Sequence, residues 1–341
     1  MSHRIGELFA GYGGLGAGVQ EAIGGDIAWF SEIDTAPSKI LAHNFPGIPN
    51  HGDITKIDWS TVEPVDILTG GFPCQDVSHA GARAGLKEGT RSGLWSYFAE
   101  AISALKPELV VIENVRGLLS ADAHGPLEPD EGSLGKGKRL PTLRALGAVL
   151  GDLARLGYDA EWHSVQACDA GAPHRRFRVF ILAYPNAGRR RKYNAGIGGL
   201  PISHEVSREP ATDTSCERGH EGDHVAGISR EGDDRATLAN EHSARSGVTE
   251  WGVYRPAIER WERVTGRAAP APTMPDGKNG SHRLAAQFVE HMMGLSEGHV
   301  TSPLIGLTRN QQLKALGNGV VPQQATLALR LMLGQQERLA A

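Results

Sequence analysis

Cysteine is scarce in this sequence, and the three that occur, Cys74, Cys168 and Cys216, lie far apart with no CxxC pair. Neither a disulfide framework nor a zinc site is therefore indicated, and a reduced, cytoplasmic setting is expected. Long apolar runs are also missing, so no membrane-spanning helix is predicted. The N-terminal residues MSHRIGELF lack the apolar stretch of a signal peptide.

An excess of positive charge is missing too, because 35 Lys and Arg residues face 39 Asp and Glu residues, for a net charge of −4. This balance argues against nucleic-acid binding over the whole surface, but a local basic strip remains compatible with it. Two such strips occur, at 174–178 (HRRFR) and at 189–192 (RRRK). Between 201 and 245 there is no aromatic residue, and ten acidic residues outnumber five basic ones. That segment is expected to be rich in loops or partly disordered.

The remaining sequence alternates between apolar strand patterns and amphipathic helix patterns. Strands are expected at 4–10, 27–33, 65–73, 108–115, 162–167 and 178–184, and helices at 14–23, 37–44, 94–105 and 146–156. This alternation predicts an α/β fold with a doubly wound, mostly parallel sheet covered on both faces. Residues 122–141 read as a surface insertion. Further helical patterns occupy 251–264, 283–295 and 322–333, and the last is expected to fold back beside the first strand.

The first strand pattern leads into FAGYGGLG, where Gly11, Gly13 and Gly16 have GxGxxG spacing and an acid, Glu32, follows. A nucleotide-like ligand at a strand-to-helix turn needs such glycines for close backbone approach. The same spacing is typical of NAD-dependent dehydrogenases, so it does not by itself choose between hydride transfer and other chemistry.

Three further features carry reactive groups. Cys74 follows an apolar strand pattern and a glycine pair, where the ligand crevice of an open α/β sheet lies, and its thiolate would be a nucleophile. Glu113 ends the next strand pattern, so it should lie near Cys74 if the two strands are neighbours, and burial would suit it to general-acid work. Arg176 and Arg178, two residues apart, are expected on one face of a strand, where they could grip a base carbonyl or a phosphate.

With these residues the chain resembles the C5-cytosine DNA methyltransferases over nearly all of its length except 185–280. Several motifs in the order of that family carry the resemblance, namely Phe9-x-Gly11-x-Gly13-Gly14, Pro73-Cys74-Gln75, Glu113-Asn114-Val115, Arg176-x-Arg178 and Gly317-Asn318-Gly319-Val320. QFVEHMMGL further resembles the phage and actinobacterial branch. His174 and Arg175 stand where the family usually has Gln and Asn.

The resemblance implies methyl transfer from S-adenosyl-L-methionine to C5 of a flipped-out cytosine in a specific duplex DNA sequence, through a covalent bond between Cys74 and C6. It gives Glu113 a role at N3 of the base and Arg178 a role near the base carbonyl, and Arg176 is implied as a further catalytic residue. The implied cofactor-binding residues are Phe9, Gly11, Gly13, Gly14, Leu15, Glu32 (ribose), Ile33, Asp53 (adenine), Ile54, Pro73, Asn318 and Val320. The candidate DNA-binding residues are Gln75, Ser78, Arg91, Arg189, Arg190, Arg191 and Lys192.

The same resemblance implies the domain organisation and the partners. Residues 1–184 are expected to bind the cofactor and to carry the catalytic groups in a sheet of the S-adenosylmethionine-dependent methyltransferase type. Residues 185–280 would form a small, irregular target-recognition domain, and 281–341 would return to the first domain. Duplex DNA is the expected partner, with no metal, no membrane and no obligate protein partner. The chain is expected to act as a monomer in a bacterial cell or phage-infected host, as in restriction–modification.

Three alternatives bear on this interpretation. A dehydrogenase would leave Pro-Cys-Gln, Glu-Asn-Val and the arginine pair without a role, so hydride transfer is set aside. A non-catalytic relative is disfavoured because Cys74, Glu113 and Arg178 are all present. An RNA-methylating version of the fold remains open, although the Cys-Phe-Thr signature of that branch is absent.

Overall fold

A six-stranded sheet forms the centre of the protein in a computed structural model that describes residues 2–73, 93–120, 145–186 and 251–340. Its strands are β1 (Arg4–Leu8), β2 (Asp26–Ser31), β3 (Ile67–Gly70), β4 (Leu109–Val115), β5 (Tyr158–Gln166) and β6 (Phe177–Pro185). Their order in the sheet is β2-β1-β3-β4-β6-β5. β1 is parallel to β2 and β3, and β3 is parallel to β4, whereas β6 is antiparallel to β4 and β5. The expected mostly parallel sheet is confirmed.

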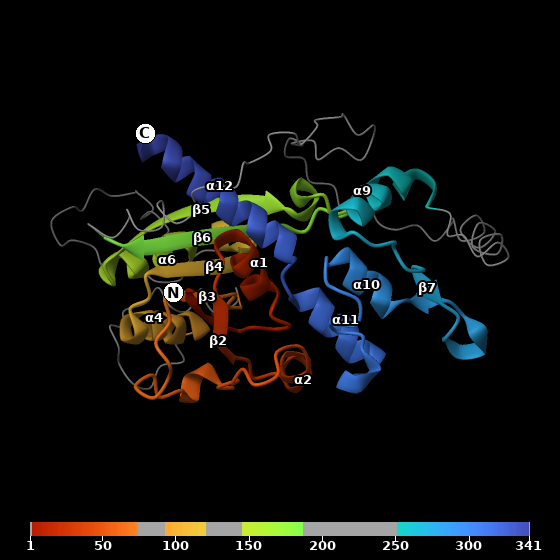
Figure 1. Cartoon of the computed structure of the whole chain (residues 1–341), viewed down its shortest axis with the longest axis horizontal. Coiled ribbons are helices and arrows are strands. Elements are labelled where there is room, and N and C mark those ends of the chain that lie inside the picture. The colour runs from red at the N-terminus through yellow and green to blue at the C-terminus, as the bar shows by residue number, and fades with distance from the viewer. Residues whose placement is uncertain (1, 74–92, 121–144, 187–250, 341) are drawn as a thin grey trace, which may run out of the picture.

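Helices cover both faces of this sheet and continue into a second, mainly helical part (Figure 1). The helices are α1 (Gly14–Ile23), α2 (Thr35–Asn44), α4 (Leu94–Leu105), α5 (Gly117–Ser120), α6 (Ala145–Arg155), α9 (Arg255–Thr265), α10 (Ala286–Met292), α11 (Arg309–Asn318) and α12 (Pro322–Ala340). The short elements are η1 (Ile54–Lys56), η3 (Ala167–Ala170), η4 (Gly252–Tyr254), η5 (Lys278–Gly280), η6 (Pro303–Ile305) and the hairpin strands β7 (Thr273–Met274) and β8 (Arg283–Leu284).

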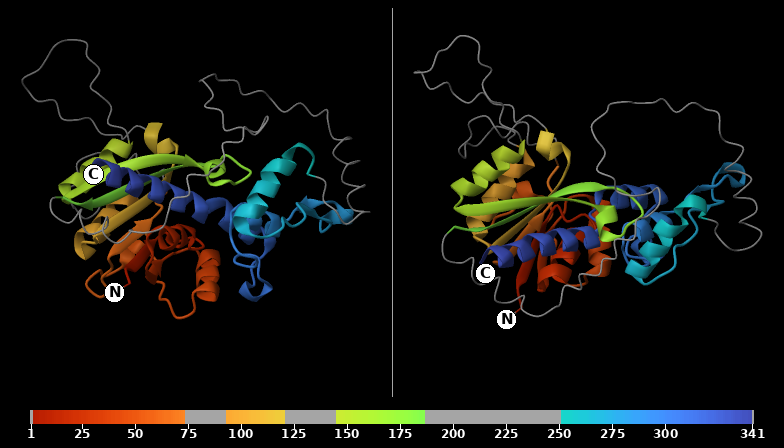
Figure 2. Two further views of the ribbon diagram at one scale, coloured as in Figure 1. Left: turned by 45° about the horizontal axis from the view of Figure 1, so that its top comes forward. Right: turned by 90° about the horizontal axis from the view of Figure 1, so that it is seen from above.

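The strand residues alternate between two apolar cores, because neighbouring side chains of a strand point to opposite faces. Leu8, Leu68 and Val110 pack into one core with residues of α4 and α6. Ile5 and Ile67 pack into the other core with residues of α1 and α12. Seen from above, α12 (blue) lies on one side of the sheet and α6 on the other (Figure 2). The doubly wound arrangement expected from the sequence is therefore present.

The last helix returns to the first one, as the sequence pattern predicts. The Thr326 hydroxyl of α12 donates to the carbonyl of Gly18 in α1 at 3.2 Å. A Cβ atom on Gly18 would lie only 2.6 Å from the Ala325 Cβ, so the two helices approach closely because residue 18 has no side chain. α12 also contacts β5 and β6, and it thereby closes one face of the sheet.

A third apolar core joins the second part of the chain to the first. It contains Trp261 of α9, Leu316 of α11 and Met293. These side chains pack with Tyr12 and Ile40 from the N-terminal half. The Trp261 Nε1 donates to the carbonyl of His291 in α10 at 2.8 Å. The helical part thus packs against the loop that follows β1 and against α2.

Several details differ from the sequence expectations. The first strand ends at Leu8 because Phe9 has a φ of 53°, which a strand does not accommodate. Arg176 lies one residue before β6 and not within it. Cys168, in η3, is disulfide-bonded, although no disulfide framework was indicated.

Other expectations stay untested. The proposed insertion at 122–141 and the acidic segment 201–245 lie outside the described residues. Among the residues that are described, no helix is both long and apolar enough to cross a membrane.

Candidate functional site

The turn between β1 and α1 is built from residues with left-handed backbone. Phe9, Gly11 and Gly13 have φ values of 53°, 57° and 83°. Gly13 is the N-cap of α1, so the first free N–H groups of that helix point toward the end of the sheet. A Cβ on Gly11 would meet no atom within 4 Å, which means that the space beside this backbone is open to a ligand. The turn therefore has the features that close approach of a nucleoside-like group requires.

Glu32 lies just beyond β2 and is tied to this turn. Its Oε2 accepts the Gly11 N–H at 2.7 Å, and its Oε1 accepts the Asp34 N–H at 2.7 Å. Burial raises the pKa of Glu32, while the two backbone donors favour the charged form. Each carboxylate oxygen keeps a second lone pair, which suits the group to receive ligand hydroxyls.

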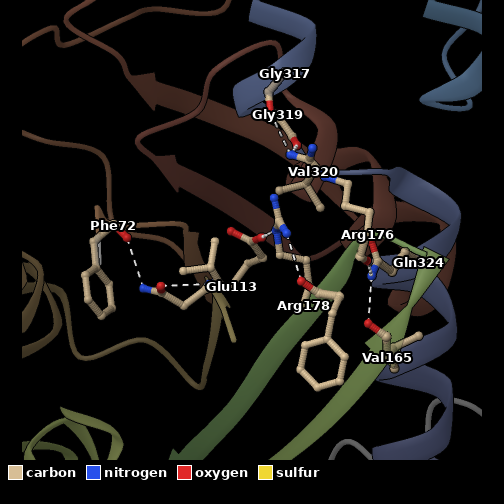
Figure 3. Close-up of polar contacts among 12 residues, drawn as sticks. Phe72, Glu113, Val165, Arg176, Arg178, Gly317, Gly319, Val320 and Gln324 are labelled. Carbon is tan, nitrogen blue, oxygen red and sulfur yellow. Dashed lines mark hydrogen bonds and ion pairs between the residues drawn. The ribbon is translucent and has the colours of Figure 1, made fainter. Parts of the chain in front are cut away.

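Glu113 lies near the end of β4, next to β3 in the sheet, as the sequence argument requires. Its Oε1 is 2.7 Å from the Arg178 Nε of β6, and both side chains are nearly buried (Figure 3). Burial raises the pKa of Glu113, and the positive charges of Arg178 and Arg176 oppose that rise. The carboxyl is thus held with its proton more firmly than an exposed glutamate would hold it.

Asn114 fixes the ends of β3 and β4 with respect to each other. Its Nδ2 donates to the carbonyl of Phe72 at 3.0 Å, and its Oδ1 accepts the Val115 N–H at 2.8 Å. Gly71 adds to this close fit, because a Cβ there would lie 2.8 Å from the Glu113 Oε2. Gly71 and Phe72, which lead toward Cys74, are therefore held against Glu113 and Asn114.

The turn between α11 and α12 forms a further wall. The Tyr12 hydroxyl donates to the carbonyl of Val320 at 2.7 Å, and a Cβ on Gly319 would overlap the Tyr12 ring. The Arg176 Nη2 donates to the carbonyls of Gly317 and Gly319 at 2.9 and 2.5 Å (Figure 3). This turn thereby carries Asn318 and Val320 to the edge of the sheet beside the β1–α1 turn.

These elements enclose one cavity of about 600 Å³, a size in the usual range for small-molecule sites. Among the sequence-predicted residues, those that line it are Phe9, Gly11, Leu15, Glu32, Pro73, Glu113, Arg178, Asn318 and Val320. The open space at Gly11, the acceptors of Glu32 and the apolar walls fit a nucleoside that carries an amino-acid chain, as S-adenosylmethionine does. Its far wall, with Glu113 and Arg178, could hold a second ligand next to the first.

Other predicted residues are not in the lining of this cavity. Gly13 and Gly14 shape the turn, Ile33 is 67% exposed, Ile54 is buried in an apolar core, and Arg176 binds the α11–α12 turn. Asp53 accepts from the Thr55 N–H and hydroxyl at 3.0 and 2.8 Å, and these bonds lower its pKa. Its expected role at an adenine has no support from its contacts.

The remaining predicted residues lie outside the described part of the chain, namely Cys74, Gln75, Ser78, Arg91, Arg189, Arg190, Arg191 and Lys192. Nothing in the structure tests them. Cys74 is bonded to Pro73, which lines the cavity.

The sequence did not predict several residues that hold the main chain around the site. Glu7 of β1 is buried, lines the cavity, and accepts the Gly16 N–H at 3.0 Å. Burial raises the pKa of Glu7 to about 8. The Tyr12 hydroxyl donates to the carbonyl of Val320 in the α11–α12 turn, and the Gln324 Nε2 donates to the carbonyl of Arg176 beside that turn. An acid inside the apolar pattern of β1 was the one available signal, since polar groups within buried strands usually have a partner.

The central sheet, with helices on both faces and this cavity at its edge, has the fold of the S-adenosylmethionine-dependent methyltransferase type. A model of the family "C-5 cytosine-specific DNA methylase" matches residues 3–231. The chain belongs to this family.

Individual relatives agree with the family. Type II methyltransferase M.NlaIV of Neisseria lactamica is 34% identical over 180 residues, which cover 51% of this chain and 40% of the relative. Type II methyltransferase M.MspI of Moraxella sp is 26% identical over 332 residues, covering 95% of this chain and 70% of the relative. The alignment with M.NlaIV thus spans less than half of that protein's length.

Solved structures show the same fold. Dnmt2 methyltransferase of S. pombe has a TM-score of 0.54 at 16% identity, with 99% of both chains covered. A Dnmt2 variant of Spodoptera frugiperda has a TM-score of 0.55 at 14% identity, with 97% of this chain and 99% of the other covered.

Proposed function

We propose that this protein is a DNA (cytosine-5-)-methyltransferase, which uses S-adenosyl-L-methionine to methylate C5 of a cytosine flipped out of a specific duplex sequence. The observation that carries the proposal is the buried Glu113–Arg178 pair, at 2.7 Å, in the wall of the cavity that Glu32 and Asn318 also line. One end of this cavity suits a nucleoside cofactor, and the other offers an acid and a fixed guanidinium for a base. Family membership and the type II methyltransferase relatives support the same chemistry.

The cofactor would supply an electrophilic methyl group. Glu32 would receive its ribose hydroxyls, because this carboxylate is already oriented by the Gly11 and Asp34 N–H groups. Phe9 and Val320 would provide apolar walls, and the N-terminal N–H groups of α1 would favour the cofactor carboxylate.

The chain's own groups would make cytosine reactive. The thiolate of Cys74 would form a bond to C6, and the electron pair of the C5–C6 double bond would become available at C5. A proton from Glu113 to N3 favours this addition, and a raised pKa keeps that proton available. Transfer of the methyl group to C5 would release S-adenosylhomocysteine. C5 would then lose its hydrogen as a proton to solvent, the thiolate would leave to restore the double bond, and N3 would return its proton to Glu113. Arg178 would donate to the base carbonyl, and it would stabilise the Glu113 carboxylate while the proton is on N3.

Duplex DNA is the proposed partner. Its target cytosine would have to be flipped out, because a stacked cytosine could not reach a buried carboxyl. Flipping the base costs a few kcal/mol, which contacts to the phosphates and to the flipped base must offset. Arg189, Arg190, Arg191 and Lys192 are the proposed phosphate contacts. We further propose that the protein works as a monomer in the bacterial cytoplasm, and that residues 185–280 select the target sequence.

Transfer of tritium from methyl-labelled S-adenosylmethionine tests the proposal directly. Purified protein should label duplex DNA and leave tRNA unlabelled, and bisulfite sequencing of a plasmid from expressing cells should then give the target sequence. Label in tRNA alone would reverse the substrate assignment. No label in either would refute the activity.

The nucleophile is tested separately. Cys74→Ala should abolish both methylation and covalent trapping on 5-fluorocytosine DNA, whereas Glu63→Gln, at an exposed side chain that pairs with Arg4, should retain them. Trapping by Cys74→Ala would exclude Cys74 as the nucleophile.

A further inference from the structure

Arg176 lies beside the cavity but not in its lining, unlike Arg178 two residues later. Its guanidinium instead reaches the turn between α11 and α12, where the Nη2 donates to the carbonyls of Gly317 and Gly319 at 2.9 and 2.5 Å. These two carbonyls flank Asn318, which lines the cavity. The two arginines of the motif therefore have different partners.

The chemistry of a helix end explains this contact. α11 ends at Asn318, and the carbonyls of a last helical turn have no partner within the helix. A guanidinium there supplies donors and a positive charge at the negative end of the helix dipole. Because Arg176 is partly buried, loss of its side chain would leave these carbonyls with less compensation.

The main chain of Arg176 is held as firmly as its side chain. The Nε2 of Gln324 in α12 donates to the carbonyl of Arg176 at 2.7 Å and to the carbonyl of Val165 at 2.8 Å. Arg176 is thus joined to α12 through its backbone and to the end of α11 through its guanidinium. Since Tyr12 binds the carbonyl of Val320, the turn is fixed from both the β1–α1 side and the β6 side.

We infer that Arg176 is a positioning residue: it holds the cofactor-side wall, with Asn318 and Val320, against the strand that carries Arg178. The inference rests on the proposed function, and it replaces the sequence expectation that Arg176 and Arg178 together grip a base carbonyl or a phosphate. Its consequence is specific. Affinity for S-adenosylmethionine, measured without DNA, should depend on Arg176 although this side chain does not line the cavity.

Calorimetric titration of the DNA-free, full-length protein with S-adenosylmethionine tests this dependence. Arg176→Met should weaken binding by about tenfold or more, as expected for loss of charge-assisted hydrogen bonds. Arg176→Lys should recover part of the affinity, because an ammonium can still serve one carbonyl. Arg330→Met is the matched control, since Arg330 pairs with Glu21 on the outer side of α12 and should leave binding unchanged.

Steady-state kinetics give the second readout. Arg176→Lys should raise KM for S-adenosylmethionine more than KM for DNA, whereas a residue that contacts the base would do the reverse. Equal cofactor binding by wild-type, Arg176→Met and Arg176→Lys proteins would overturn the inference. If the Met variant is unfolded in a thermal melt, the Lys variant decides alone. Absence of cofactor binding by the wild-type protein would instead refute the proposed function.

Discussion

Glu113 and Arg178 each depend on the other because both side chains are nearly buried, at 11% and 15% exposure. A buried charge that loses its partner keeps the cost of its desolvation, so removal of either group has a larger effect than the pair's net contribution. The fit is close on the other side as well, since Glu113 Oε2 would meet a Cβ at position 71. The carboxyl therefore has one orientation, with one oxygen on Arg178 and the other toward Gly71.

The first prediction concerns the proton of Glu113. Glu113→Gln keeps an acceptor for Arg178 but removes the acid, so the single-turnover methylation rate should fall by about 10²–10⁴-fold. S-adenosylmethionine affinity should remain near that of the wild type. Rapid-quench assays on duplex DNA measure the rate, and Glu63→Gln, at an exposed side chain that pairs with Arg4, is the control. An unchanged rate would contradict the assigned role.

Single residues differ in how well the sequence predicts them. Glu32 and Glu113 could be assigned from their positions at strand ends, because parallel strands bring their carboxyl ends to one edge. Arg176 could not, since its partners at Gly317 and Gly319 are more than 140 residues away and are main-chain carbonyls. Because every residue type has a main-chain carbonyl, the sequence does not indicate which residue accepts such a hydrogen bond.

At the scale of elements, the contact between α1 and α12 controls how the last helix closes the sheet. Gly18→Ala should destabilise the protein by about 1–3 kcal/mol, because the new Cβ would lie 2.6 Å from the Ala325 Cβ. Gly151→Ala, in α6, is the matched control, since its Cβ would meet only the Arg155 Nη1, at 3.8 Å. That change should stabilise by about 0.5–1 kcal/mol. Urea unfolding measures both, and effects of equal sign would contradict the packing argument.

The elements themselves were predicted where burial is periodic. The strands and the helices α1, α4 and α12 follow apolar patterns that the sheet and its two cores enforce. α11 was missed because RNQQLKALGN carries few apolar residues and only Ala315 and Leu316 are buried. Its start did have a signal, the capping box of Thr308 and Gln311. Packing against Tyr12, and not local periodicity, decides the position of its C-terminal end.

At the scale of the whole molecule, two buried groups make the stability of the protein depend on pH in opposite directions. Glu7 lies under α1, and burial raises its pKa from 4.5 to about 8. His291 lies in the helical part, where its ring nitrogens have no hydrogen-bond partner among the described residues. Burial lowers the pKa of His291 from 6.5 to about 4, Arg267 adds to this, and Glu262 opposes it.

The signs follow from proton binding. Between pH 4.5 and about 8 the native state keeps the Glu7 proton that the unfolded chain has lost, so stability falls as pH rises through this window. Between pH 6.5 and about 4, His291 binds a proton in the unfolded chain but not in the native state, so stability falls as pH falls. Where the two windows overlap the slopes oppose each other, and above pH 6.5 only the loss from Glu7 remains.

Two variants separate these contributions in urea unfolding curves recorded from pH 4.5 to 9. The unfolding free energy of Glu7→Gln, relative to wild type, should rise by about 1.4 kcal/mol per pH unit up to pH 8, because Gln mimics the protonated acid. For His291→Gln the relative free energy should rise as pH falls below 6.5 and stay constant above it. A constant offset reports packing alone, so only the slope is diagnostic. Curves parallel to wild type at every pH would mean that neither group keeps an altered charge in the folded protein.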